Sequence, residues 1–156
     1  MVGRLQAEIK SKKEFESAEE EVYLNLQRTA DALERGIVEV LKPANLSPTQ
    51  YNVLRILRGA GPDGLACREI AERMVTRDPD ITRLLDRLEA RDLVTRMREQ
   101  KDRRVITVRI TREGLRILKE LDREVVELHQ RQLEHMGERR LRSLIDLLEM
   151  AREKVE

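Results

Sequence analysis

Basic side chains gather in one stretch of the sequence, between Asp78 and Arg112. From Val94 to Arg112 there are seven Lys and Arg residues but only two acidic ones, Glu99 and Asp102, although the whole chain has 31 basic and 30 acidic residues and a net charge of +1. Local clusters of this kind, rather than the total charge, govern affinity for phosphate. An arginine fork can also bind the O6 and N7 atoms of guanine. The residue types therefore favour contact with a nucleic acid; the alternative is an ordinary solvated surface.

The first part of this stretch is predicted to be a short helix. Asp78 is the expected N-cap, because its carboxylate can accept from the free amides of the first turn, and Pro79 suits the first helical position. Hydrophobic and polar side chains then occupy separate faces, namely Ile81, Leu84, Leu85 and Leu88 on one face and Asp80, Arg83, Arg87 and Arg91 on the other. The apolar face is expected to pack on a core and to leave the arginines open.

The second part is predicted to be a two-stranded hairpin. After Asp92 the hydrophobic period falls from 3.6 to two, over residues 93–98 and 105–110, and residues 100–104 form a basic loop between them. A helix with arginines on its open face, followed by a hairpin with an arginine-rich tip, is the plan of a winged helix-turn-helix. Double-stranded DNA is the first partner to expect.

Helical patterns fill most of the remaining chain. One long helix is expected from Glu14 to Lys42, and residues 1–13 either extend it or form a frayed basic arm. The other expected helices begin at the capping box Ser47-Pro48-Thr49-Gln50, at Arg68, at the Thr111 cap and at about Glu138 after a break at Gly137. The residues expected to face inward are Tyr51, Val53, Leu54 and Leu57 in the first of these helices and Ile70, Ala71 and Met74 in the second. In the third they are Leu115, Leu118, Leu121, Val125 and Leu128, and in the fourth Leu141, Leu144, Ile145 and Leu148.

These elements predict a mainly α fold with a small β-hairpin wing, in which four helices precede the wing and two follow it. Residues 46–111 form the winged helix-turn-helix, and residues 1–45 and 112–156 form a helical dimerisation region. The apolar seams of the terminal helices are expected to be covered by a second copy of the chain; packing within one chain is the alternative.

Composition narrows the possible partners. No apolar run approaches the about 20 residues of a membrane span, and residues 1–15 lack the apolar core of a signal peptide, so a cytoplasmic location and no membrane partner are expected. The chain has two Tyr, one Phe and no Trp. Proteins that bind single strands stack bases on aromatic side chains, so the scarcity of aromatics favours duplex DNA.

The order of these predicted elements resembles that of the MarR (multiple antibiotic resistance regulator) family of transcription factors. The resemblance extends from about Val22 to Met150. The segments that carry the resemblance are LSPTQYNVLRIL (46–57), REIAERM (68–74), DITRLLDRLEARDLVTR (80–96) and DRRVITVRITREG (102–114). The resemblance implies a homodimer with interlocked terminal helices. It also implies a helix that enters the major groove of a pseudo-palindromic operator, a wing that enters the minor groove, and more often repression than activation.

The resemblance also assigns residues. The implied DNA-binding set is Asp80, Thr82, Arg83 and Arg87 on the helix, Arg96 just beyond it, and Lys101, Asp102, Arg103 and Arg104 in the wing, with Asp102 holding Arg104 by an ion pair. Asp92 stands where the family usually has a glycine, and an aspartate can adopt the left-handed turn at modest cost. Family members often release DNA when a small phenolic or other aromatic acid binds, and Tyr51 and Tyr23 are the candidate ligand-contacting residues, with plain core packing as the alternative.

Other functions have weaker support. A winged-helix protein-interaction module that does not bind DNA leaves the arginines of the helix and wing unexplained. Cys67 precedes a predicted helix and is a candidate redox sensor, with an inert small residue as the alternative. His129 and His135 are six residues apart, so they point in different directions on one helix, and no catalytic or metal-binding motif accompanies them. We expect no enzyme activity, no metal and no cofactor.

Overall fold

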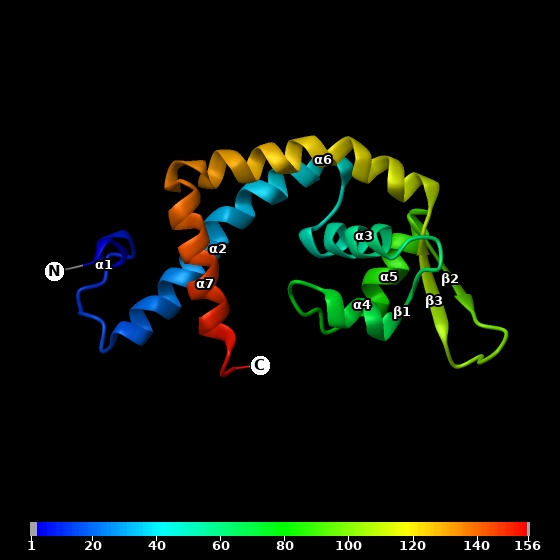
Figure 1. The fold of residues 1–156 in the computed structure, drawn as a ribbon, viewed down its shortest axis with the longest axis horizontal. Coiled ribbons are helices and arrows are strands. Elements are labelled where there is room, and N and C mark those ends of the chain that lie inside the picture. Colours follow the sequence, from blue (N-terminus) through cyan, green and yellow to red (C-terminus); the bar gives the residue numbers. More distant parts are fainter. Residues whose placement is uncertain (1–2, 156) are drawn as a thin grey trace. The chain divides into compact units, whose positions relative to one another are not determined.

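The computed structural model describes residues 3–155 and divides the chain into two compact units, residues 1–37 and 38–156. The elements follow the order α1, α2, a 3₁₀ turn, α3, β1, α4, α5, β2, β3, α6, a second 3₁₀ turn and α7 (Figure 1). Helices predominate, and the strands form one small antiparallel sheet, which confirms the predicted fold class.

The first unit differs from the prediction at its amino end. Residues 4–8 form a separate short helix, α1 (Arg4–Glu8), which buries Leu5, and Lys10 then turns the chain with a positive φ of 52°. The long helix α2 (Ala18–Leu41) begins four residues later than expected, because the Ser17 hydroxyl accepts from the Glu20 amide at 3.1 Å. Residues 3–13 are therefore neither an extension of the helix nor a frayed arm; residues 1 and 2 lie outside the described part.

The second unit starts with the last turn of α2, which buries Val40 and Leu41, and a 3₁₀ turn at Lys42–Ala44. The next helix is α3 (Pro48–Ala60), and its predicted capping box is confirmed. The Gln50 amide donates to the Ser47 hydroxyl at 3.1 Å, and the Ser47 amide donates to the Gln50 side chain at 2.9 Å. All four predicted inward residues of α3, Tyr51, Val53, Leu54 and Leu57, are buried.

Two shorter helices complete the helix-turn-helix. In α4 (Cys67–Arg73), Ile70 is buried as predicted, whereas Ala71 is exposed. The arginine-bearing helix α5 (Ile81–Ala90) is capped by Asp80, whose carboxylate accepts from the Arg83 amide at 3.0 Å. The prediction of Asp78 as N-cap and Pro79 as first helical residue was wrong. Asp78 instead accepts from the Asp80 amide at 2.8 Å, which closes a local turn before the helix.

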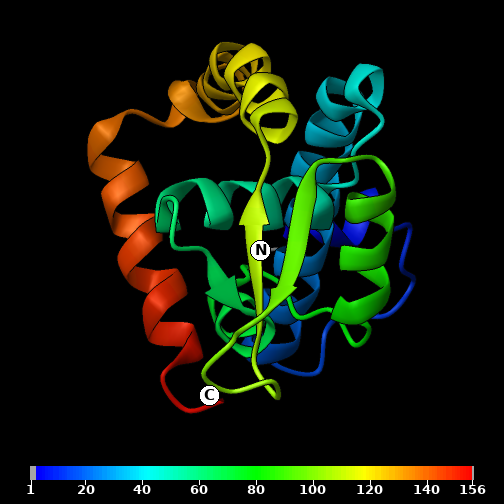
Figure 2. The same cartoon turned by 90° about the vertical axis from the view of Figure 1, so that its right-hand side faces the viewer.

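The sheet has one strand more than the predicted hairpin. β2 (Val94–Arg98) and β3 (Ile106–Ile110) pair as expected, and β1 (Leu65–Ala66) adds to the other edge of β3, so that the order is β1-β3-β2 (Figure 2). Gly64 has a φ of 69°, and a Cβ there would collide with the Val108 carbonyl, so this glycine allows β1 to reach the sheet.

The chain then enters α6 (Arg112–Leu133), which Thr111 caps by accepting from the Gly114 amide at 3.0 Å. In Figure 1 this helix leads away from the wing and over α3. Its buried large apolar side chains are Ile117, Leu118, Leu121, Val125 and Leu128, so that Ile117 takes the inward position predicted for the exposed Leu115. A 3₁₀ turn (Glu134–Met136) and Gly137, with a φ of 76°, precede α7 (Glu138–Arg152).

The last helix buries no residue in the single chain. Of its predicted seam, Leu141, Leu144 and Leu148 are half-buried and Ile145 is exposed, as are Leu147 and Met150. No helix in the described part of the chain is both long enough and apolar enough to cross a membrane.

A glycine pair tests how tightly α6 packs against the winged helix. A Cβ at Gly114 would lie 2.6 Å from the Leu93 carbonyl oxygen, whereas one at Gly59 would have no neighbour within 4 Å. We expect Gly114→Ala to lower the free energy of unfolding by about 1–3 kcal/mol. The control Gly59→Ala should leave it unchanged or raise it by up to about 1 kcal/mol. Urea titrations measure both, and equal effects of the two changes would contradict the close approach.

Candidate nucleic-acid interface

One face of α5 is open and basic while the opposite face is part of the core. Leu84, Leu85 and Leu88 are buried. Three predicted site residues, Thr82, Arg83 and Arg87, are exposed on the other side. Within residues 3–155 the guanidinium groups of Arg83 and Arg87 have no ion-pair partner, so their donors are available to another molecule.

The amino end of α5 borders a small groove that also includes the start of α3. The groove has a volume of about 160 Å³ and is lined by Ser47, Thr49, Gln50, Asp78, Asp80, Arg83, Leu84 and Arg87. Arg83 and Arg87 bring positive charge to this groove. The carboxylates of Asp78 and Asp80 also line it, but each accepts from a backbone amide at the start of α5. The two guanidinium groups can therefore bind an anion such as a phosphate group. Sequence reasoning gave α3 a core role and Tyr51 as a candidate ligand contact, but no part in an anion-binding groove. The polar residues beside its cap were the signal that it missed.

Two further basic side chains lie at the end of α4 and in the turn that follows it. Arg73 and Arg77 are exposed, and neither was among the predicted site residues. The turn is held to α3, because the Val75 amide donates to the Asn52 side chain at 2.9 Å. Two arginines in five residues were the signal available in the sequence.

The loop of the wing carries the other predicted residues. Lys101, Asp102, Arg103 and Arg104 are all exposed, and the Arg104 side chain is 94% accessible. The predicted ion pair is present: Asp102 lies 3.5 Å from the Arg104 guanidinium and also accepts from the Arg104 amide at 3.0 Å. Arg98 donates to the Arg103 carbonyl at 2.9 Å. The loop is thereby tied to its own strand, and the guanidinium of Arg104 extends beyond it.

Arg96 is placed differently from the other predicted arginines. Its guanidinium contacts Asp86 at 2.6 Å and Glu89 at 3.0 Å, both on α5, and only 24% of its side chain is accessible. The Glu89 side chain also accepts from the Arg96 amide at 3.1 Å. Hydrogen bonds from Arg96 lower the pKa of Glu89 below its ordinary value. Arg96 thus joins the first wing strand to α5.

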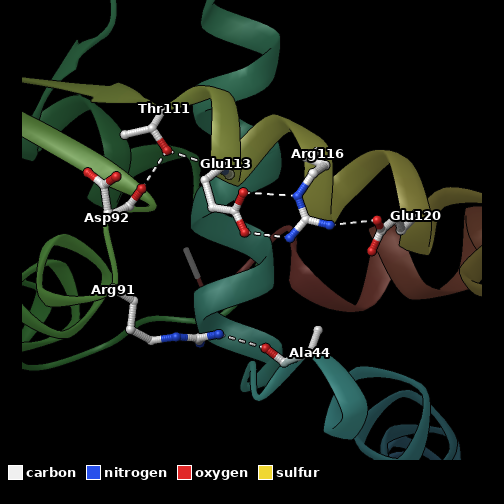
Figure 3. A network of polar contacts seen from close by, with 8 residues as sticks. Ala44, Arg91, Asp92, Thr111, Glu113, Arg116 and Glu120 are labelled. Carbon is white, nitrogen blue, oxygen red and sulfur yellow. Dashed lines mark hydrogen bonds and ion pairs between the residues drawn. The ribbon is translucent and has the colours of Figure 1, made fainter.

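The carboxyl end of α5 is anchored on two sides (Figure 3). Arg91 donates to the carbonyls of Ala44 and Asn45 at 2.8 and 2.6 Å. Asp92 has the predicted left-handed φ, 57°, and its carbonyl accepts from the hydroxyl of Thr111 at 2.6 Å. Further along α6, Arg116 bridges Glu113 and Glu120 within the helix.

A larger groove lies where the end of α2, the start of α3 and α5 meet. It measures about 620 Å³ and is lined by Val38, Glu39, Lys42, Asn45, Leu46, Ser47, Gln50, Arg87, Ala90 and Arg91. Tyr51, one of the two predicted ligand-contacting residues, does not line it. Tyr51 is 7% exposed, and burial raises the pKa of its hydroxyl. Tyr23 belongs to the first unit, is exposed, and accepts a hydrogen bond from Gln27. Within the second unit, Tyr51 is thus a core residue and does not reach this groove.

Cys67 is half-buried at the start of α4, and burial raises the pKa of its thiol. Reactive thiols are those whose pKa is lowered, so this environment favours the protonated, less reactive form at neutral pH. Among the described residues there is no cluster of three or more His, Cys, Asp or Glu side chains that could hold a metal ion.

Comparisons with known proteins agree with this geometry. The family model described as MarR family matches residues 46–106. A crystal structure of a MarR transcription factor from Planctomyces limnophilus is 44% identical, with a TM-score of 0.67, and the match covers 88% of this chain and 99% of that one. The transcriptional repressor CouR, solved bound to a 23-mer DNA duplex, is 26% identical with a TM-score of 0.75 over 89% of this chain and 99% of that one.

A curated relative is similar over a shorter length. The HTH-type transcriptional repressor MdtR of Bacillus subtilis (strain 168) is 35% identical over 94 residues, which are 60% of this chain and 59% of the relative. The match thus spans little more than half of MdtR.

The Arg96 contacts predict a pH-dependent contribution to stability. Because the folded-state pKa of Glu89 is lowered, the pair stabilises the fold above the ordinary Glu pKa of about 4.3, and its contribution is lost as the pH falls through the lower folded-state value. The difference in unfolding free energy between the wild type and Arg96→Met should therefore shrink between pH 7 and pH 3. In a Glu89→Gln background this difference should vary less with pH. Parallel pH profiles in both backgrounds would contradict the assignment.

Proposed function

Because the chain belongs to the MarR family of transcriptional regulators, we propose that it binds double-stranded DNA in a sequence-specific manner, as a homodimer on a pseudo-palindromic operator. The observation that carries this proposal is the set of arginines without ion-pair partners on α5, Arg83 and Arg87, together with the highly exposed Arg104 of the wing. The description of the relative CouR as bound to a DNA duplex supports it.

In the proposed complex, α5 enters the major groove with its amino end forward. Arg83 lies in the first turn, where a guanidinium fork can bind O6 and N7 of a guanine and supply sequence discrimination. Thr82 precedes it on the same exposed end. Arg87 is one turn further on and borders both grooves of the protein surface, so we assign it to a phosphate. Asp80 positions the first turn as its cap rather than contacting DNA.

The wing makes the second contact, in the minor groove. A narrow minor groove concentrates negative potential, and an arginine on a slender hairpin tip can enter it. We assign this role to Arg104, with Asp102 orienting it, and we assign Lys101 and Arg103 to neighbouring phosphates. The two carboxylate contacts of Arg96 support a positioning role for this residue, because they use the donors that DNA would need.

The homodimer proposal rests on the exposed apolar side chains of the long helices. In the second unit, Val126 on α6 and Ile145, Leu147 and Met150 on α7 are open to solvent, although these helices have apolar faces of the kind that pack. Val22, Tyr23 and Leu26 on α2 are similarly exposed in the first unit. A second copy would cover such surfaces and would place two winged helices on the two half-sites of a symmetric operator.

We also propose that the protein is a repressor that releases DNA when a small aromatic or phenolic acid binds. The relative MdtR is described as a repressor. The larger groove combines apolar Val38, Leu46 and Ala90 with basic Lys42 and Arg87 and one acidic residue, Glu39. Because Arg91 already donates to two backbone carbonyls, Lys42 and Arg87 are the cations that suit an aromatic ring bearing a carboxylate. A ligand that bound Arg87 there would compete with the phosphate assigned to the same side chain. We therefore propose the larger groove, rather than the two tyrosines, as the effector site.

Arginine variants distinguish DNA binding from the alternative function, a protein-interaction module that does not bind DNA. We expect Arg83→Ala to weaken operator binding by about 5- to 150-fold and to relax the preference at one base pair. Arg104→Ala should weaken binding and reduce the slope of log affinity against log salt by about one. Fluorescence anisotropy with labelled duplexes measures both quantities.

The control is Arg139→Ala, which removes the same charge from an exposed position on α7. It should leave DNA affinity unchanged. If Arg83→Ala and Arg104→Ala bind the operator as tightly as the control does, the proposed interface is wrong.

A charge on the open face of α7 tests the homodimer. Leu147 is 60% exposed in the single chain, so Leu147→Arg costs the monomer little but would bury a charge in the proposed dimer. We expect the wild type and the conservative control Leu147→Met to sediment as dimers in analytical ultracentrifugation, and Leu147→Arg to sediment as a folded monomer at low micromolar concentration. A monomeric wild type would contradict the dimer and the operator symmetry derived from it.

A further inference from the structure

Val75 is an apolar residue whose side chain is exposed rather than packed in the core. It is 86% exposed, the highest value among the large hydrophobic side chains of residues 3–155. It lies in the turn between α4 and α5, three residues before Asp78, which lines the small groove. A valine here gains nothing from burial in the free protein.

The backbone of Val75 is nevertheless held in place by a hydrogen bond to another helix. Its amide donates to the Asn52 side chain at 2.9 Å. Asn52 is three residues from Thr49 on α3, so both side chains are on the same side of that helix, and Thr49 lines the small groove. Asn52 therefore holds the Val75 backbone next to the groove. A β-branched side chain on a fixed backbone has few rotamers to lose on binding.

The surroundings of Val75 are basic and directly precede α5, the helix assigned above to the major groove. Arg73 and Arg77 flank it at two residues on either side, and both are exposed. Phosphate contacts by these arginines would bring the turn to the edge of the major groove, together with the amino end of α5. The apolar feature of base pairs in that groove is the C5 methyl group of thymine, which aliphatic side chains contact.

Resting on the proposed function, we propose that Val75 is a specificity-determining residue that contacts the methyl group of a thymine in each half-site. Arg83 and Val75 then read two kinds of feature. The arginine recognises hydrogen-bond acceptors on a guanine, and the valine recognises a methyl group. The arginines that flank Val75 add affinity that does not depend on sequence.

The test combines a protein change with a single-methyl change in the DNA. Each thymine of a selected operator is replaced symmetrically by deoxyuridine, which removes only the C5 methyl group, and dissociation constants are measured for the wild type and Val75→Ala. At one thymine position, wild-type binding should weaken by about fourfold for each half-site. Val75→Ala should bind the unmodified operator less tightly by a similar factor and should be insensitive to deoxyuridine at that position.

Val155→Ala is the matched control, because Val155 is also highly exposed, at 80%, and lies outside the winged helix. It should behave as the wild type does on every duplex. The inference is overturned if Val75→Ala shows the affinity of the wild type, or if it keeps the same sensitivity to every deoxyuridine. In both of those cases the wild type still binds the operator, so the proposed function stands. A wild type that binds no duplex would overturn both.

Discussion

The placement of the basic surface depends on the junction at the carboxyl end of α5. Asp92 turns the chain there with a left-handed φ, and its carbonyl accepts from the same Thr111 hydroxyl that caps α6. Gly114 lets the start of α6 pack directly on the Leu93 backbone. From the other side, Arg91 binds two carbonyls of the connection between α2 and α3. The orientation of α5 is thus tied to the helices on both sides of it, which gives a structural route by which a change in those helices would move the basic surface.

Six arginines of the second unit fall into two groups by their contacts. Arg96 and Arg116 each bridge two carboxylates, and Arg58 binds Asp122 through two hydrogen bonds at 2.9 and 3.0 Å. These three connect or stiffen structural elements. Arg83 and Arg87 have no such partner among the described residues, and Arg104 has one at 3.5 Å. A nearly neutral chain can in this way present a basic face, because some of its acidic residues bind arginines such as Arg96, whereas Arg83 and Arg87 on α5 have no carboxylate partner among the described residues.

Much of this arrangement could be predicted from the sequence, because local rules determine it. The Ser47 capping box, the buried stripe of α5, the Thr111 cap and the positive φ of Asp92 each depend on residues a few positions apart. The errors arose where neighbouring signals competed or contacts were distant. Asp78 and Asp80 both resemble caps, and only the turn that Asp78 closes decides between them. The strand β1 has two residues and exists through its pairing with β3, which no local pattern reveals.

The candidate site also combines features that the local sequence predicts with features that depend on distant contacts. The exposure of Thr82, Arg83 and Arg87 follows from helical periodicity. The carboxylate partners of Arg96 on α5, and the tertiary bond from Val75 to Asn52, required the folded chain. The burial of Ile117 instead of the predicted Leu115 also required the folded chain. Both residues fit the apolar pattern of α6, and only the packing shows which of them is buried.

The most direct test of the central claim is selection of duplexes from a random library by the purified protein at two salt concentrations, with sequencing of the retained pool. The proposed dimeric winged helix predicts an enriched inverted repeat whose half-sites lie about one helical turn apart, bound with an affinity that falls steeply with salt. A retained pool without an enriched motif, and with affinity independent of salt, would contradict sequence-specific DNA binding.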